Sequence, residues 1–170
     1  MSATTSARVE VKVSVLGEAQ LHRALQGRIR RTSDLRPAFE QIADDFFEGE
    51  GKAFDREGSY EGNPAWTALN PQYAERKART HPGARILTRS GKLREAMTGG
   101  SGSIREVAPL RLVVGGSVTV GKGRRWDLGS LHQKGTTRGM PARKVVNLAR
   151  RQRHRWVRFI ADHLRIEGRE

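Results

Sequence analysis

Residues 142–165, ARKVVNLARRQRHRWVRFIADHLR, carry the clearest helical pattern in the chain and set the fold expected around them. On a helix that turns by about 100° per residue, the apolar side chains gather on one side and the basic ones beside them. The stretch therefore predicts one amphipathic helix of about 36 Å that packs on a core. Its expected buried side consists of Val145, Leu148, Ala149, Trp156, Phe159, Ile160 and His163, and its basic stripe of Lys144, Arg151, Arg155, Arg158 and Arg165.

Periodicity predicts a strand and two helices in the first third of the chain. In residues 9–15, valines alternate with polar side chains, which is typical of a strand with one buried face. Residues 18–31 repeat apolar side chains at helical spacing, and so does the segment that follows Pro37. The apolar stripe of this second helix consists of Phe39, Ile42, Ala43, Phe46 and Phe47, and Gly49 and Gly51 are expected to weaken the helix near its end.

Capping residues predict where the helices begin. Ser33 or Asp34 is expected to cap the second helix. Asn70, followed by Pro71, predicts the start of a short helix over residues 71–79. Ser90 is expected to cap another short helix.

The remaining middle of the chain predicts a hairpin and a long loop. Residues 104–108 and 110–120 are rich in β-branched side chains, and a bulge is expected at Gly115 and Gly116. Residues 121–139 contain many glycines and basic side chains, which predict a long basic loop that reaches a partner. The expected fold is α+β: a small, mainly antiparallel sheet packed with helices. We expect one domain over residues 9–165, a flexible arm over residues 1–8 and a tail over residues 166–170.

The charge of the chain favours an anionic partner. The net charge of +14 on 170 residues attracts nucleic acid, an anionic membrane or an acidic protein surface. Residues 34–57 are locally acidic and residues 138–169 strongly basic, so the acidic segment of one copy could face the basic segment of the next in a ring. No stretch approaches the ~20 apolar residues of a membrane span, and cysteine is absent, which together predict a soluble, unexported protein without disulfides.

The basic residues are the candidate contacts with a partner or with DNA. Their positions in the loop and on the last helix suit a sequence-independent attraction to phosphate or to an acidic protein. A solvated arginine face is the alternative interpretation of the same pattern. The candidates are Lys122, Arg124, Arg125, Lys134, Arg138, Arg151, Arg155 and Arg158.

Catalytic patterns are missing from the sequence. The histidines are scattered and lack the ligand spacing of a metal site, and no phosphate-cradling loop is present. His132 near Asp127 is the best candidate for a nuclease-like acid or base, but a capped turn or an interface hydrogen bond explains the pair more simply. We therefore predict no catalytic residue, no metal and no cofactor.

Four short motifs follow one another between Trp66 and Arg143. They are Trp66, Leu69, Tyr73 and Lys77; then ILTRSGKL (86–93); then LHQKG (131–135); and finally MPAR (140–143). In this order and spacing they resemble the phage virion morphogenesis, or tail-completion, proteins. The resemblance covers residues 21–164. Its motif residues are expected to be structural: Trp66, Leu69, Tyr73, Leu87, Gly91, Leu93, His132, Gln133, Gly135, Pro141 and Arg143.

The resemblance implies a structural protein of the tailed-phage virion that is made in the host cytoplasm and has no enzymatic turnover. Such a protomer would form a homo-oligomeric ring, expected to be hexameric, at the neck. Its partners would be the tail tube or tail terminator, the head-tail connector or stopper, and the genomic DNA in the lumen, with no membrane. A free, non-sequence-specific nucleic-acid-binding protein is the alternative from another class.

Overall fold

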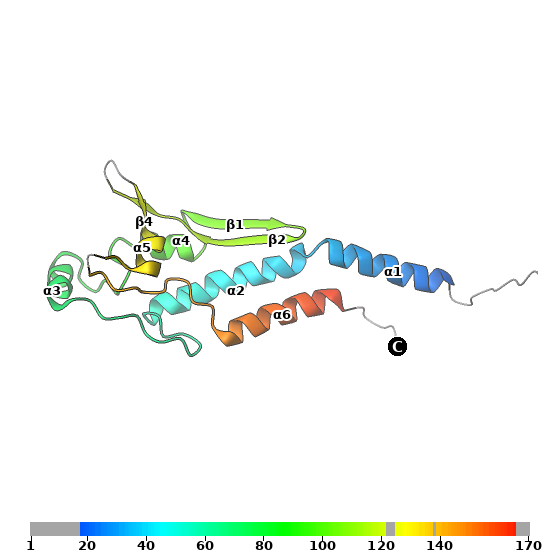
Figure 1. The fold of residues 1–170 in the computed structure, drawn as a ribbon, viewed down its shortest axis with the longest axis horizontal. Helices are drawn as coiled ribbons and strands as arrows, with labels where there is room; N and C mark the ends of the chain where they lie inside the picture. Colours follow the sequence, from blue (N-terminus) through cyan, green and yellow to red (C-terminus); the bar gives the residue numbers. More distant parts are fainter. Residues whose placement is uncertain (1–17, 122–124, 138, 166–170) are drawn as a thin grey trace, which may run out of the picture.

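The computed structural model describes residues 18–121, 125–137 and 139–165 (Figure 1). The predicted α+β fold is confirmed: helices pack with small antiparallel sheets. The elements are α1 (Glu18–Ser33), α2 (Arg36–Asp55), α3 (Pro71–Thr80), α4 (Lys92–Met97), β1 (Ser103–Ala108), β2 (Arg111–Gly116), β3 (Thr119–Val120), β4 (Trp126–Asp127), α5 (Leu128–Lys134) and α6 (Arg150–Leu164). The predicted strand over residues 9–15, the arm and the tail lie outside the described residues.

Helix α2 is the centre of the fold. The β1–β2 hairpin and α4 lie along one side of it and α6 along the other (Figure 1). The rings of Phe46 and Phe47 meet edge to face at 5.3 Å, and Phe54 meets Trp66 in the same way at 5.2 Å. Leu93, Met97 and Val145 complete the buried cluster. The apolar stripe predicted for this helix is therefore what the rest of the chain packs against.

Gly49 does not weaken the end of α2, which continues to Asp55. A Cβ atom at this position would lie 2.8 Å from Nε2 of Gln152, so the glycine leaves room for this side chain of α6 against α2. Close packing of the two helices compensates for the low helix propensity of glycine.

The helix caps were predicted correctly at one of three positions. Asn70 caps α3, because its side chain accepts a hydrogen bond from the backbone N–H of Gln72 at 3.0 Å. The N-cap of α2 is Leu35, and Asp34 instead binds the backbone and guanidinium of Arg36. The N-cap of α4 is Gly91 and not Ser90. The cap residue has a left-handed conformation (φ 74°), which a serine would adopt only with strain.

The hairpin prediction is confirmed, but its second strand is shorter than expected. β1 and β2 pair in antiparallel register from Ser103 with Gly116 to Ala108 with Arg111. A Cβ atom on Gly116 would lie 2.6 Å from the carbonyl oxygen of Ala96, so the strand ends where its backbone rests on α4. β3 then pairs with β4 in a separate sheet. The predicted long loop is therefore interrupted by β4 and α5.

The prediction of one helix over residues 142–165 was wrong in its first third. The helix begins at Arg150 and is about 22 Å long. Residues 142–149 are not helical, and Arg143 and Val145 are buried while Lys144 between them is exposed. Side chains from elsewhere bind the backbone of this segment, which removes the need for a helical ladder.

Helix α1 extends away from the body of the molecule (Figure 1). Its described side chains are nearly all exposed, including Leu25 (49% exposed) and Ile29 (65%). Among the described residues, its hydrogen bonds to other elements come from its last turn, where Arg31 donates to the carbonyl of Arg165 and its own carbonyl contacts Nε2 of His163 on α6. Within the described ranges, no helix is both long enough and apolar enough to cross a membrane.

One carboxyl group is buried in α2 without a partner. Glu50 is 5% exposed, and its Oε2 atom has no hydrogen bond to any described residue. Burial raises the pKa of Glu50 to about 8, because desolvation disfavours the charged form. The folded protein therefore holds a proton on Glu50 that the unfolded chain releases above about pH 4.5.

This proton makes stability fall with pH, because the folded state binds more protons than the unfolded state between about pH 4.5 and 8. We expect Glu50→Gln to remove that slope. Relative to wild type, the change in the free energy of unfolding should be more favourable at pH 8 than at low pH by on the order of 4 kcal/mol. Thermal unfolding across pH measures this. Glu48→Gln is the control on the exposed side of α2, and an equal pH dependence in both variants would contradict the expectation.

Candidate functional site

The first and last sequence motifs are bound to each other. The guanidinium of Arg143, a residue only 5% exposed, donates from Nε to the carbonyl of Thr67 at 2.7 Å and from Nη2 to that of Ala68 at 2.9 Å. In return, Nε1 of Trp66 donates to the carbonyl of Lys144 at 2.8 Å. Two segments more than 70 residues apart are thus joined by three hydrogen bonds.

The third motif joins the same network through Gln133. Its side-chain amide donates to the carbonyl of Val146 at 3.0 Å and accepts from the N–H of Val146 at 3.1 Å. The backbone N–H of Arg143 donates to the carbonyl of His132 at 2.7 Å. Gln133 and His132 therefore supply the partners that a neighbouring strand would otherwise offer to residues 143–146.

Gly135 allows the chain to turn back toward this segment. It follows α5 with a φ of 72°, and a Cβ atom there would lie 2.8 Å from the backbone of both Met140 and Ala142. Only glycine fits, so the turn places Pro141 and Arg143 against α5. Of the other motif residues, Leu93 is buried, Leu69, Tyr73 and Gly91 are half-buried, and Leu87 packs against the core with a φ of 63°.

His132 and Asp127 are not joined by a hydrogen bond or ion pair among the described residues. Asp127 caps α5, accepting from the backbone N–H of Ser130 at 2.6 Å, and it also binds Ser117. His132 is half-buried, and burial, with a smaller effect of the nearby Arg143, lowers its pKa. Its Nδ1 atom is buried without a partner in the described structure. Asp127 is therefore the N-cap of α5, and His132 contributes its backbone carbonyl to the segment around Arg143.

The phage virion morphogenesis family model matches residues 17–165. The chain belongs to the phage virion morphogenesis family. No curated protein and no solved structure matches it significantly.

Membership in the phage virion morphogenesis family gives the chain a role in the assembly of a phage virion. In this family member the network of Trp66, Gln133 and Arg143 is internal, so it fixes the shape of the folded chain. Within the described ranges, no group of three His, Cys, Asp or Glu side chains is placed to hold a metal ion.

The predicted arginines of α6 separate into an inner and an outer set. Arg155 turns inward: its guanidinium binds Asp45 at 2.9 Å and Glu61 at 2.6 Å, and both carboxylates raise its pKa. Nε1 of Trp156 donates to the same Asp45 at 2.7 Å. Arg155 is thereby engaged in holding α6 on α2.

Arg151 and Arg158 turn outward. They lie two helical turns apart on one face of α6 and line a shared hollow with Arg150, His154 and the exposed Val157, and Arg155 also borders this hollow. Neither has an ion pair with another residue that the structure describes. We call the outward residues Arg150, Arg151, His154 and Arg158 the arginine face.

The acidic segment, residues 34–57, has few carboxylates that are not already paired within the same molecule. Most of its carboxylates bind cations of the same molecule, Glu57 accepts a hydrogen bond from the backbone N–H of Ile86, and the buried Glu50 holds a proton near neutral pH. A head-to-tail contact between acidic and basic segments therefore has little unpaired acid available. The internal pairs are Asp34 with Arg36, Glu40 and Asp44 with Arg105, Asp45 with Arg155, Glu48 with Lys52, and Asp55 with Arg94.

The predicted loop cations are only partly described. Arg125 and Lys134 are exposed, beside β4 and at the end of α5. Lys122, Arg124 and Arg138 lie outside the described residues. The structure places Arg125 and Lys134 on different elements from the arginine face.

Sequence reasoning missed Glu50 and Gln152 as important positions. Both line a cavity of about 210 Å³ between α2, the segment around Trp66 and the start of α6. Glu50 lies four residues from both Phe46 and Phe54, so its place on an apolar stripe is a signal of burial that the sequence did contain.

Arg143→Lys tests the motif network. A lysine cannot reproduce the two-pronged contact with Thr67 and Ala68, so we expect the free energy of unfolding to fall by about 2 kcal/mol. Chemical denaturation measures the loss. Arg153→Lys, the same change at an exposed position of α6, should have little effect, and equal losses in the two variants would show that the buried contact is not what stabilises the fold.

Proposed function

We propose that the protein is a structural virion component that forms a ring at the neck of a tailed phage, completes the tail and joins it to the head connector. In this role it has no turnover and needs no cofactor. The observation that carries the proposal is the motif network, in which Arg143, Trp66 and Gln133 are all used to fix the protomer. Membership in the virion morphogenesis family supports it.

The arginine face is the surface best suited to the neighbouring rings. Within the described ranges its cations have no ion pair, whereas most carboxylates of α2 have one, so a partner would supply the anions. An acidic surface of the tail tube, tail terminator, connector or stopper meets this requirement. DNA in the lumen meets it as well, through phosphate contacts that do not depend on sequence.

Phage particles made without the protein test the proposal. We expect electron microscopy to show DNA-filled heads and separate tails, because the component that joins them is missing, and we expect labelled protein at the neck of complemented virions. Wild-type gene supplied in trans is the control. Joined particles formed without the protein, or purified virions that do not contain it, would refute the role.

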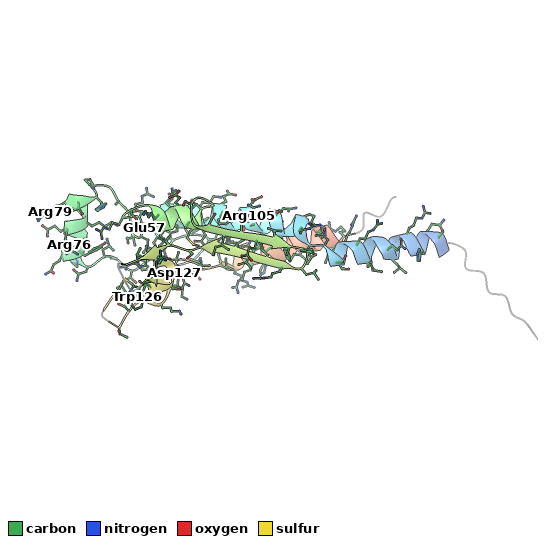
Figure 2. All side chains as sticks on the ribbon, turned by 90° about the horizontal axis from the view of Figure 1, so that it is seen from above. Glu57, Arg76, Arg79, Arg105, Trp126 and Asp127 are labelled. Atoms are coloured by element: carbon green, nitrogen blue, oxygen red, sulfur yellow. The ribbon has the colours of Figure 1, made fainter. Side chains whose placement is uncertain are left out.

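The alternative function, free nucleic-acid binding, is favoured by one observation: Arg151 and Arg158 are exposed and unpaired among the described residues. Arg151→Glu with Arg158→Glu should then weaken binding to duplex DNA and reduce the slope of log affinity against log salt by roughly 2. The control is Arg76→Glu with Arg79→Glu on α3, at the opposite end of the molecule from α1 (Figure 2).

The two functions predict different outcomes for this pair of variants. If the α6 variant loses DNA binding but assembles virions normally, the nucleic-acid role is correct and the arginine face is not a virion contact. If virion joining fails while DNA binding of the wild-type protein is weak, the structural role holds.

A further inference from the structure

The β1–β2 hairpin is an incomplete sheet. Within the described residues it has only two strands. The N–H of Ser103 at the start of β1 donates to the carbonyl of Gly100 at 3.0 Å, whereas no hydrogen bond to another described residue covers the outer edge of β2. An isolated two-stranded hairpin is marginally stable, and unpaired strand edges readily accept a further strand. None of its residues is fully buried. The hairpin is therefore able to accept a third strand.

The two edges differ in how well they are protected. β1 carries two adjacent charges, Arg105 and Glu106, which disfavour pairing with another strand. β2 has the sequence RLVVGG and carries no charge after Arg111. Its apolar, β-branched centre makes β2 the edge that is open to a new strand.

The segment before α1 has the sequence of such a strand. Residues 9–15 read VEVKVSV, with a valine at every second position. Residues 1–17 lie outside the described part of the chain, so only their sequence and their length enter this inference. An alternating strand of this kind needs a sheet on which to place its valines.

Its own hairpin is out of reach. Pro109 at the hairpin turn accepts a hydrogen bond from Leu35, so the turn lies at the C-terminal end of α1, and α1 runs away from it for about 24 Å (Figure 1). Residues 9–15 are attached to the far end of α1 through residues 16–17, which span at most about 7 Å. If the strand ran back along α1, its roughly 23 Å would end near Leu35, before the hairpin begins.

We propose that residues 9–15 of one copy pair with β2 of a second copy, adding a third strand to its hairpin. This deepens the proposed ring and rests on it, because α1 becomes the arm that carries the strand to the neighbour. The side of the hairpin that faces α2 carries Arg105, which binds Glu40 and Asp44, and Val114, which packs on the core. The valines of the added strand extend that side, and Glu10 and Lys12 lie beside Glu106 and Arg111 on the other.

Disulfide trapping between copies tests the pairing. The chain has no cysteine, so two single variants can be mixed without background. Val113→Cys marks the outer side of β2, and Glu10→Cys, Lys12→Cys and Ser14→Cys mark the same side of the added strand. We expect at least one of these three to form a dimer with Val113→Cys, because a disulfide requires Cα atoms within about 7 Å. Val11→Cys and Val13→Cys point to the other side and are the matched controls.

Two results of the trapping would overturn the pairing. One is the absence of any cross-link between the mixed variants under conditions where the wild-type protein self-associates. The other is a disulfide within a single chain when Lys12→Cys and Val113→Cys are combined and diluted, since that would place the strand on its own hairpin.

Replacing valines of the added strand by aspartate distinguishes the strand-pairing proposal from the proposal that the protein forms a ring. Val11→Asp with Val13→Asp should lower the mass of the assembled protein measured by light scattering, and Glu10→Ser with Lys12→Ser should not. If the Asp variant assembles and joins virions like wild type, strand exchange is wrong and the ring stands. If the wild-type protein stays a single chain even with tail tubes, both proposals fail.

Discussion

The fold depends on the buried guanidinium of Arg143. A charged group that is 5% exposed must have its hydrogen-bonding capacity met, and the carbonyls of Thr67 and Ala68 meet it. Those carbonyls belong to an irregular segment that is pinned in turn by the ring of Trp66. α6 begins seven residues after Arg143, so this contact helps to fix the path of the chain into the last helix. Removing the guanidinium would leave the two carbonyls without their donors, while Arg155 and Trp156 would still hold α6 on α2.

Electrostatics then divide the molecule into an internally paired body and an unpaired surface. The carboxylates of α2 bind Arg105, Lys52, Arg94 and Arg155, so helix, hairpin and α6 are linked through charge as well as through packing. Most of these pairs are exposed and contribute little each, but the pairing of Arg155 with Asp45 and Glu61 is largely shielded from water. The excess positive charge of the chain is left on surfaces such as the arginine face, where it gives the protein an attraction to anions without affecting its core.

The sequence predicted those elements whose own residues determine them. The stripe of α2, the cap of α3 and the hairpin follow from local spacing, and each is confirmed. Residues 142–149 were mistaken for helix because Val145, Leu148 and Ala149 also fit a helical stripe. Whether such a segment is helical or extended depends on Trp66, Gln133 and Thr67, which lie far away or on another element, and no local pattern contains that information. Arg155 could not be told from Arg151 and Arg158 for a similar reason, since its acidic partners come from α2 and the loop that follows it.

The least buried elements, α1 and the outer side of α6, lie at the periphery of the fold, and their exposure accounts for their polar and charged side chains. α1 and the outer side of α6 contribute few side chains to the core, so little of the folding free energy fixes them in place. A helix of 16 residues that leaves the body is marginally stable in water by itself. A chain with an internally bonded centre and weakly held outer elements can gain order at its periphery on binding, without any change in its motifs. In a protein of virion assembly, this arrangement keeps the residues that fix the fold apart from the exposed residues of α1 and α6.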